Sequence, residues 1–110
     1  MAGRRIYKLR RLKMILYKQG VTNEKVNIMD IAGTDVGISA AVMVMASGTW
    51  TGDVKLSISF DGKKFVPLRD KTGAEVVLVK DTPSFLASVD AYLKVNAASV
   101  TSSDLTVEVQ

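Results

Sequence analysis

The side chains that could carry chemistry in this sequence are carboxylates in turn-like segments. Asp30 with Asp35, or Asp53 with Asp61, could form the kind of carboxylate pair that a glycosidase places across a sugar. Asp61 precedes Gly62, as in some calcium loops, but the segment lacks the further alternating carboxylates that calcium requires. Nothing in the spacing brings either pair together, and Asp-Gly is typical of tight turns. We therefore predict turn residues here, and no catalytic residue, metal site or cofactor.

The residue types on which most familiar enzymes depend are missing. The chain of 110 residues contains no histidine and no cysteine. It therefore cannot form a Ser-His-Asp triad, a Cys-His pair, a thiolate zinc site or a disulfide framework. The longest apolar stretches are far shorter than the ~20 residues of a membrane-spanning helix, and we see no secretory signal. We expect a soluble intracellular product that is not an enzyme and does not enter a membrane.

Positive charge is concentrated near the N-terminus. Residues 1–25 carry eight basic side chains and one acidic side chain, a net charge of +7, whereas residues 26–110 have a net charge of −3. The basic arm, residues 1–12, favours an anionic partner such as nucleic acid, an acidic protein surface or a second copy of this chain. Charged residues also protect exposed terminal strands from aggregation. The candidate docking residues on the arm are Arg4, Arg5, Tyr7, Lys8, Arg10 and Arg11.

Trp50 is the only tryptophan and lies in the glycine-flanked segment Gly48–Gly52. If its ring covers the end of a β-sandwich, its role is structural. If the ring is exposed, it offers a stacking platform for a sugar or an anchor in an interface. We include Trp50 among the candidate partner-docking residues.

Short strands are the elements that must position these residues. Alternating apolar and polar residues predict a half-buried antiparallel strand over Val54–Phe60, with Phe60 on the core side. Asp61-Gly62 predicts a tight hairpin that leads into a partner strand at Lys64–Leu68. Because Pro67 cannot donate a ladder hydrogen bond, this partner strand should lie at a sheet edge.

The rest of the chain follows the same strand-and-turn pattern. For the segment 36–46 a helix is the alternative. Seven to nine short strands predict an all-β fold, an antiparallel β-sandwich or jelly roll, with the arm at residues 1–12 and one domain at residues 13–110. The further predicted strands are Met14–Tyr17, Val26–Ile31, Val36–Ala46, Ala74–Lys80, Ser84–Val89, Ala91–Asn96 and Leu105–Val109.

Residues 48–68 resemble the central hairpin of small β-sandwich proteins in tailed-bacteriophage particles. The segment combines a GTWTG turn, an alternating strand and the pattern S-x-D-G-x-x-F-x-P-L from Ser59 to Leu68. The resemblance extends over about residues 45–100 and is to capsid decoration (cement) proteins and related virion modules. The same S-x-D-G-x-x-F/W pattern is also similar to a hairpin of carbohydrate-binding β-sandwiches. The alternative is therefore a carbohydrate- or receptor-binding module of a phage tail or fibre.

The resemblance implies a structural virion protein that binds the outside of a phage capsid. Such a protein is made in the host cytoplasm, binds the major capsid protein, stabilises contacts between capsid subunits and often forms a dimer or trimer. The basic arm suits this role, because arginine pairs bidentately with carboxylates on acidic patches. We do not expect nucleic acid or a membrane as partner, since the body of the chain is acidic.

Overall fold

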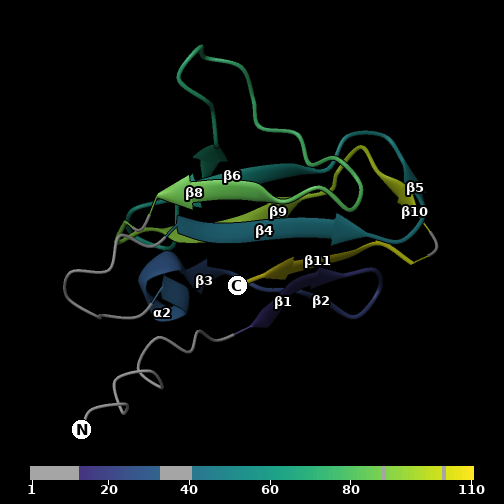
Figure 1. The fold of residues 1–110 in the computed structure, drawn as a ribbon, viewed down its shortest axis with the longest axis horizontal. Helices are drawn as coiled ribbons and strands as arrows, with labels where there is room; N and C mark the ends of the chain where they lie inside the picture. The colour runs from purple at the N-terminus through teal and green to yellow at the C-terminus, as the bar shows by residue number, and fades with distance from the viewer. Residues whose placement is uncertain (1–12, 33–40, 88, 103) are drawn as a thin grey trace, which may run out of the picture.

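Two antiparallel sheets form most of the part of the chain that the computed structural model describes, residues 13–32, 41–87, 89–102 and 104–110 (Figure 1). In spatial order, the five-stranded sheet contains β2 (Thr22–Asn23), β1 (Met14–Lys18), β11 (Thr106–Val109), β4 (Ala41–Ser47) and β8 (Ser84–Ala87). The four-stranded sheet contains β3 (Val26–Asn27), β9 (Tyr92–Asn96), β6 (Lys55–Ser59) and β7 (Val66–Pro67). A separate short pair consists of β5 (Trp50–Thr51) and β10 (Thr101–Ser102).

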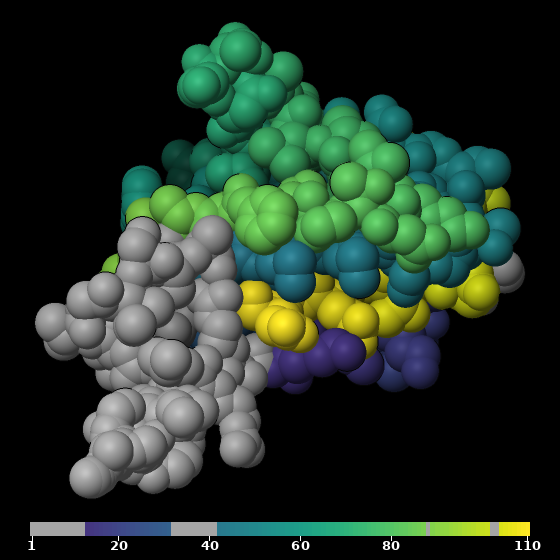
Figure 2. Space-filling view, viewed as in Figure 1, coloured from purple at the N-terminus to yellow at the C-terminus, as the bar shows by residue number. Residues whose placement is uncertain are grey.

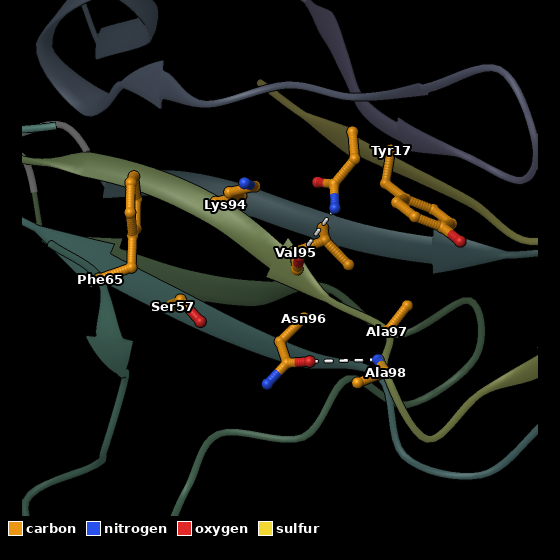
Figure 3. A pocket seen from close by; sticks show the side chains of 9 residues that line it. Tyr17, Ser57, Phe65, Lys94, Val95, Asn96, Ala97 and Ala98 are labelled. Atoms are coloured by element: carbon orange, nitrogen blue, oxygen red, sulfur yellow. Dashed lines mark hydrogen bonds between the residues drawn. The ribbon is translucent and has the colours of Figure 1, made fainter. Parts of the chain in front are cut away.

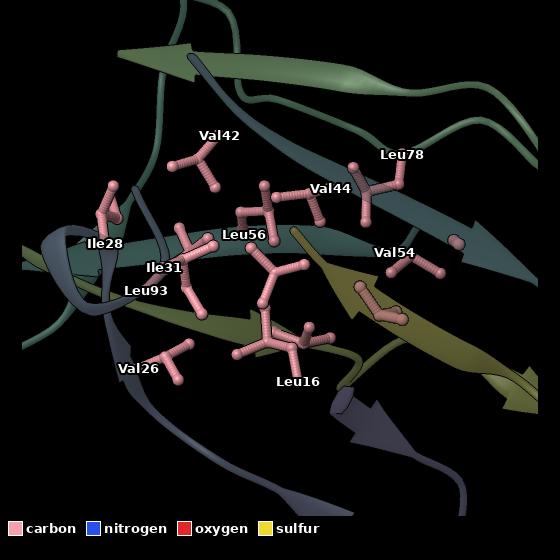
Figure 4. Packing of buried hydrophobic residues seen from close by; sticks show 14 of the residues in the cluster. Leu16, Val26, Ile28, Ile31, Val42, Val44, Val54, Leu56, Leu78 and Leu93 are labelled. Carbon is pink, nitrogen blue, oxygen red and sulfur yellow. The ribbon is translucent and has the colours of Figure 1, made fainter. Parts of the chain in front are cut away.

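The hydrophobic core lies between the two sheets (Figure 4). Alternate residues of β4, β9 and β11 point inward, as the period of two along a strand requires. Burial of these side chains removes the apolar faces of both sheets from water, which is the dominant favourable term in folding. The predicted antiparallel β-sandwich is thereby confirmed. The buried residues of these three strands and their flanks are Val42, Val44, Ala46, Ala91, Leu93, Val95, Leu105, Val107 and Val109.

The strand predicted at Val26–Ile31 is wrong beyond Asn27. Residues Ile28–Ala32 form a single helical turn, α2, in which Ile28 and Ile31 are both buried. The Asn27 side-chain oxygen accepts a 2.9 Å hydrogen bond from the backbone N–H of Met29, which is N-cap geometry. A spacing of three therefore replaces the expected spacing of two. Within the described residues, no helix is long and apolar enough to cross a membrane.

Two further segments differ from their predictions. Ala74–Lys80 makes only isolated bridges, at Glu75, Val77 and Lys80, because its chain crosses from the edge of one sheet to the edge of the other. Val36–Ala46 is described only from Ala41, where β4 is a strand and not the alternative helix; residues 33–40 lie outside the described part. The strands predicted at the N-terminal side of the domain, at residues 84–89, at residues 91–96 and at the C-terminus are present.

The tight hairpin predicted at Asp61-Gly62 is also wrong. Ile58 pairs with Val66, so a longer loop connects β6 to β7. Alternation along β6 ends at Ser59, which is buried, whereas Phe60 is exposed rather than directed into the core. The edge position predicted for the strand that contains Pro67 is confirmed, since β7 ends the four-stranded sheet.

The glycines on either side of Trp50 allow the β5–β10 pair to form. Gly48 and Gly52 have φ angles of 103° and 94°. A Cβ atom on Gly52 would collide with the carbonyl oxygen of Ser99, and one on Gly48 would collide with that of Asp104. Only glycine combines such φ values with so close an approach of two backbones.

We predict that Gly52→Ala destabilises the fold more than Gly73→Ala does. Gly73 also has a positive φ, of 90°, but its Cβ position is open, so that this variant isolates the conformational cost, about 1–2 kcal/mol. The collision at Gly52 should add about 1–3 kcal/mol to the loss in the free energy of unfolding. Urea unfolding of both variants measures the difference, and equal losses would contradict the role assigned to Gly52.

Candidate functional site

Of the residues predicted to dock a partner, only Trp50 lies in the described part of the chain. Arg4, Arg5, Tyr7, Lys8, Arg10 and Arg11 lie outside the described residues, as does the rest of the arm at residues 1–12. The described chain begins at Lys13, next to β1 and toward the β2 side of the five-stranded sheet. Lys13 Nζ lies 3.7 Å from a carboxylate oxygen of Glu108 on the neighbouring β11. The point at which the arm joins the domain is therefore fixed by this sheet.

Trp50 lies away from that point. The first residue of β1 pairs with Val109, and its last residue pairs with Thr106. Thr106 also pairs with Ser47, the last residue of β4, and Trp50 follows three residues later. Trp50 is therefore near the end of β1 that is farther from the arm. The Trp50 ring packs against the core and remains only partly exposed. It lines a hollow of about 290 Å³ with Gly48, Thr49 and Lys80. Trp50 therefore lies between the two cases considered for it, because its ring packs against the core but is not fully buried.

The S-x-D-G segment is a hydrogen-bonded loop. Asp61 Oδ1 accepts hydrogen bonds from the Ser59 hydroxyl and from the backbone N–H groups of Lys63 and Lys64, at 2.8, 2.8 and 3.0 Å. Ser59 Oγ in turn accepts a 2.9 Å hydrogen bond from the backbone N–H of Gly62. The motif therefore fixes a loop conformation, and its carboxylate is occupied by the loop itself.

The same loop is fastened to the sheet beneath it. The Lys25 ammonium donates a 2.8 Å hydrogen bond to the Gly62 carbonyl and lies 5.8 Å from the centre of the Tyr92 ring. A Cβ atom on Gly62 would approach the Tyr92 ring to 3.2 Å, tighter than an ordinary van der Waals contact. The variable position of S-x-D-G, Phe60, is thus held on an ordered loop while 85% of its surface faces solvent.

Phe60 belongs to an apolar edge that runs along one long side of the sandwich. β7 and β8 are the outermost strands of their sheets, and both lie on this side, opposite β2 and β3 (Figure 1). The chain between β7 and β8 crosses from one sheet to the other. The Leu78 N–H donates a hydrogen bond to the Val54 carbonyl, and Lys80 forms an isolated β-bridge with Ala46 on β4. Five of the eight exposed large apolar side chains of the described residues lie on these elements. We define the apolar edge as Phe60, Val66, Val77, Val79 and Phe85.

The two outermost strands of the apolar edge differ in the features that normally protect a sheet edge. β7 is two residues long and contains Pro67, and both features protect an edge. β8 has the sequence Ser-Phe-Leu-Ala, without a charged residue, and within the described chain it pairs only with β4. Phe85 on this strand is 66% exposed. Figure 2 shows the segment that contains β8 as a light-green band on the surface of the molecule. Single exposed apolar residues are ordinary, but a group of them on open edge strands is typical of an interaction surface.

The prediction that Phe60 lies in the core is wrong, and the apolar edge was not predicted. The alternation of Val54–Ile58 does not continue to residue 60, because Ser59 is buried and Phe60 is exposed. One signal was present: residues 76–79 are four consecutive apolar residues, which a half-buried strand cannot all bury. In the structure Leu78 alone of these four is buried, and Val77 and Val79 are exposed.

A second hollow lies on the outer face of the four-stranded sheet (Figure 3). It is an open groove of about 480 Å³ with Phe65 toward one end and Tyr17 toward the other. Ser57 and Lys94, which are cross-strand partners, lie between the two rings. The remaining lining residues are Asn23, Val95, Asn96, Ala97 and Ala98.

Of the two carboxylate pairs considered, the one whose members are both described, Asp53 and Asp61, does not come together. Asp53 and Asp61 lie beyond opposite ends of β6, which spans Lys55–Ser59. Asp30 is in α2, and Asp35 lies outside the described residues. Across the part of the chain that the structure describes, no three acidic side chains are grouped so that they could hold a metal ion.

The hydrogen bonds to Asp61 make the stability of this loop depend on pH. The pKa of Asp61 is lowered from 3.8 to about 2. The largest causes are the hydrogen bonds from the backbone N–H groups of Lys63 and Lys64, and the next is the hydrogen bond from the Ser59 hydroxyl. The pKa of Asp70 in the next turn is lowered too, first by the Thr72 hydroxyl. A carboxylate with a depressed pKa in the folded state stabilises the fold above its unfolded pKa, and this contribution is lost as the pH falls through the folded pKa.

We therefore predict that Asp61→Asn reduces the loss of stability in acid. The wild-type protein should lose stability between about pH 4 and pH 2, the range between the pKa of Asp61 in the unfolded chain and its pKa in the folded protein. The variant cannot ionise at this position and should lose less. Urea unfolding midpoints at pH 5 and pH 2 measure the effect, with Asp53→Asn as the control. The prediction fails if the two variants show the same acid dependence.

Comparison of the chain with known protein families, with curated proteins and with solved structures found no match. The apolar edge, the groove and the half-buried Trp50 are therefore the features from which a function has to be inferred.

Proposed function

We propose that this protein is a non-enzymatic structural component of a phage particle, a decoration or cement protein that clamps neighbouring capsid subunits. The observation that carries the proposal is the apolar edge. It is a group of exposed apolar side chains on and beside the outermost strands, and it includes Phe60 on an ordered loop. The resemblance of residues 48–68 to virion β-sandwich proteins supports the same function. The proposed partner is the major capsid protein, and the proposed location is the capsid surface.

The energetics of the edge suit an attachment surface. Burial of an exposed phenylalanine contributes about 1.5–3 kcal/mol. Phe60 and Phe85 together would supply about 3–6 kcal/mol, a large share of the ~8 kcal/mol that corresponds to micromolar affinity. Because the Ser59–Asp61 hydrogen bonds already hold the loop, little conformational entropy is lost when Phe60 is covered.

The arm and the apolar edge suit a clamp because the strand that follows the arm, β1, and the edge strand β8 lie at different places in the five-stranded sheet. β1, which follows the arm, and β8 are separated by β11 and β4 in the five-stranded sheet. Three strand spacings of about 4.8 Å place them roughly 14 Å apart. We propose that the arm, through Arg4, Arg5, Arg10 and Arg11, contacts an acidic patch of one subunit while the apolar edge covers its neighbour. Separation of the two capsid subunits would then require the loss of the binding free energy of at least one of the two interfaces.

The first prediction of this proposal concerns Phe60. Phe60→Ala should weaken attachment to empty phage shells about 10- to 100-fold, the equivalent of the lost burial. Thermal stability should stay unchanged, because the ring is exposed in the free protein. Co-sedimentation with empty shells measures attachment, and Val21→Ala, an exposed apolar residue in the turn between β1 and β2, is the matched control. Full attachment by the Phe60 variant would reject the apolar edge as the docking surface.

The second prediction concerns the arm. Deletion of residues 2–11 should leave the fold intact and abolish attachment, because five positive charges are removed. Light scattering of the intact and the truncated protein, alone and mixed with empty shells, measures both effects. Attachment that survives the deletion would remove the arm from the interface.

A dimer or trimer that dissociates on Phe60→Ala would assign the apolar edge to contacts between copies of this chain instead of the shell.

A further inference from the structure

We propose that the groove between Tyr17 and Phe65 binds an acidic saccharide, with Phe65 and Lys94 as its principal contacts. This site is additional to shell attachment and does not involve the apolar edge as defined above. It also differs from the sugar site considered at Trp50, whose ring packs against the core and lines a separate hollow with Gly48, Thr49 and Lys80. The groove lies on the outer face of the four-stranded sheet (Figure 3).

The groove exists because small side chains follow one another where the sheet would otherwise carry large ones. Ser57 on β6 stands opposite Lys94 on β9, and both point away from the core. β9 is followed by Ala97 and Ala98, which line the groove without filling it. Asn23 on β2 donates a 3.3 Å hydrogen bond to the Val95 carbonyl and thereby closes the side toward the five-stranded sheet.

The two rings supply the faces on which a sugar ring can stack. Tyr17 is half-buried against the core, and its hydroxyl donates a 2.9 Å hydrogen bond to the Gln19 side chain, so the ring is held from both ends. Phe65 is half-buried and lies beneath the Lys94 ammonium, 5.7 Å from ring centre to Nζ. The apolar C–H face of a pyranose packs against such rings, while its hydroxyl groups stay directed to polar neighbours.

The polar groups between the rings match hydroxyl groups and one negative charge. Ser57 offers a hydroxyl that can donate or accept. Asn96 Oδ1 accepts a 3.1 Å hydrogen bond from the backbone N–H of Ala98, which turns the amide Nδ2 donor in the opposite direction. Lys94 is the one charged residue among those that line the groove. A uronate carboxylate against this ammonium would form a charge-assisted hydrogen bond.

Other ligand classes fit this set of groups less well. A purely apolar ligand would cover Ser57, Lys94 and Asn96 without giving them hydrogen bonds, which costs free energy for each group. A nucleic acid strand needs a run of cations along its phosphates, whereas the groove provides a single lysine in an acidic body. An acidic saccharide uses the rings, the donors and the single cation together.

The experiment is titration of the ¹⁵N-labelled full-length protein with trigalacturonate, with maltotriose as the neutral probe. We expect shift changes at groove residues, a Kd for trigalacturonate below about 1 mM, and binding of maltotriose at least about tenfold weaker. Shifts that map to Trp50 and Thr49 instead of Phe65 and Lys94 would overturn the proposal. Absence of binding by both probes at millimolar concentration would overturn it as well.

Two variants test the named contacts. Lys94→Gln keeps the side-chain stem and should weaken trigalacturonate binding at least about tenfold, without changing the affinity for maltotriose. Phe65→Ala should weaken both probes about five- to tenfold. Lys71→Gln and Val21→Ala, exposed residues outside both the groove and the apolar edge, are the matched controls. Binding of trigalacturonate that is indifferent to Lys94→Gln would reject the site, even if Phe65→Ala does not fold. Shell attachment by Lys94→Gln stays intact, so the two proposals fail separately.

Discussion

The open edges of the two sheets are the constraint on which the arrangement of this protein depends. A sandwich of unclosed sheets leaves a row of backbone N–H and C=O groups at each edge, and these must be paired, covered or used. On one side, β2 and β3 are the outermost strands of the two sheets. The Asn23 side chain on β2 donates a hydrogen bond to the Val95 carbonyl on β9 and so links the sheets there. On the other side β7 and β8 are outermost. The chain that crosses between them pairs with the sheets only at isolated bridges, Val77 with Lys55 and Lys80 with Ala46, and leaves the side chains of Val77 and Val79 exposed.

Local hydrogen bonding explains how an exposed phenylalanine can be held in one place beside that open edge. The Asp61 carboxylate organises the loop from Ser59 to Lys64, and Lys25 and Tyr92 hold the loop against the sheet. The side chain between Ser59 and Asp61 is therefore held on the solvent side of the loop. In this chain that residue is Phe60, and an apolar side chain there costs nothing in the core while it gives the surface a fixed anchor.

The same sandwich offers two surfaces of different chemistry. The apolar edge lacks charge along β8 and suits a broad protein contact, whereas the groove combines two rings, small polar side chains and a single ammonium and suits a small polar ligand. They share the segment that contains the resemblance to virion proteins, because Phe60 and Phe65 are both in the loop that joins β6 to β7. A capsid-bound protein with its apolar edge covered would still leave the outer face of the four-stranded sheet available.

Composition and periodicity by themselves determined the all-β class, most strands, the edge position of Pro67 and the structural nature of the Asp-Gly turn, since these follow from local geometry and from a period of two. Only the tertiary structure decided which apolar residues stay outside. Alternation cannot show where a strand stops, so Phe60 was placed in the core; the helical turn at Ile28 and Ile31 depends on the Asn27 cap and on both side chains reaching the core. The apolar edge and the groove are built from residues distant in sequence, and their proximity comes from sheet order, which no local pattern specifies.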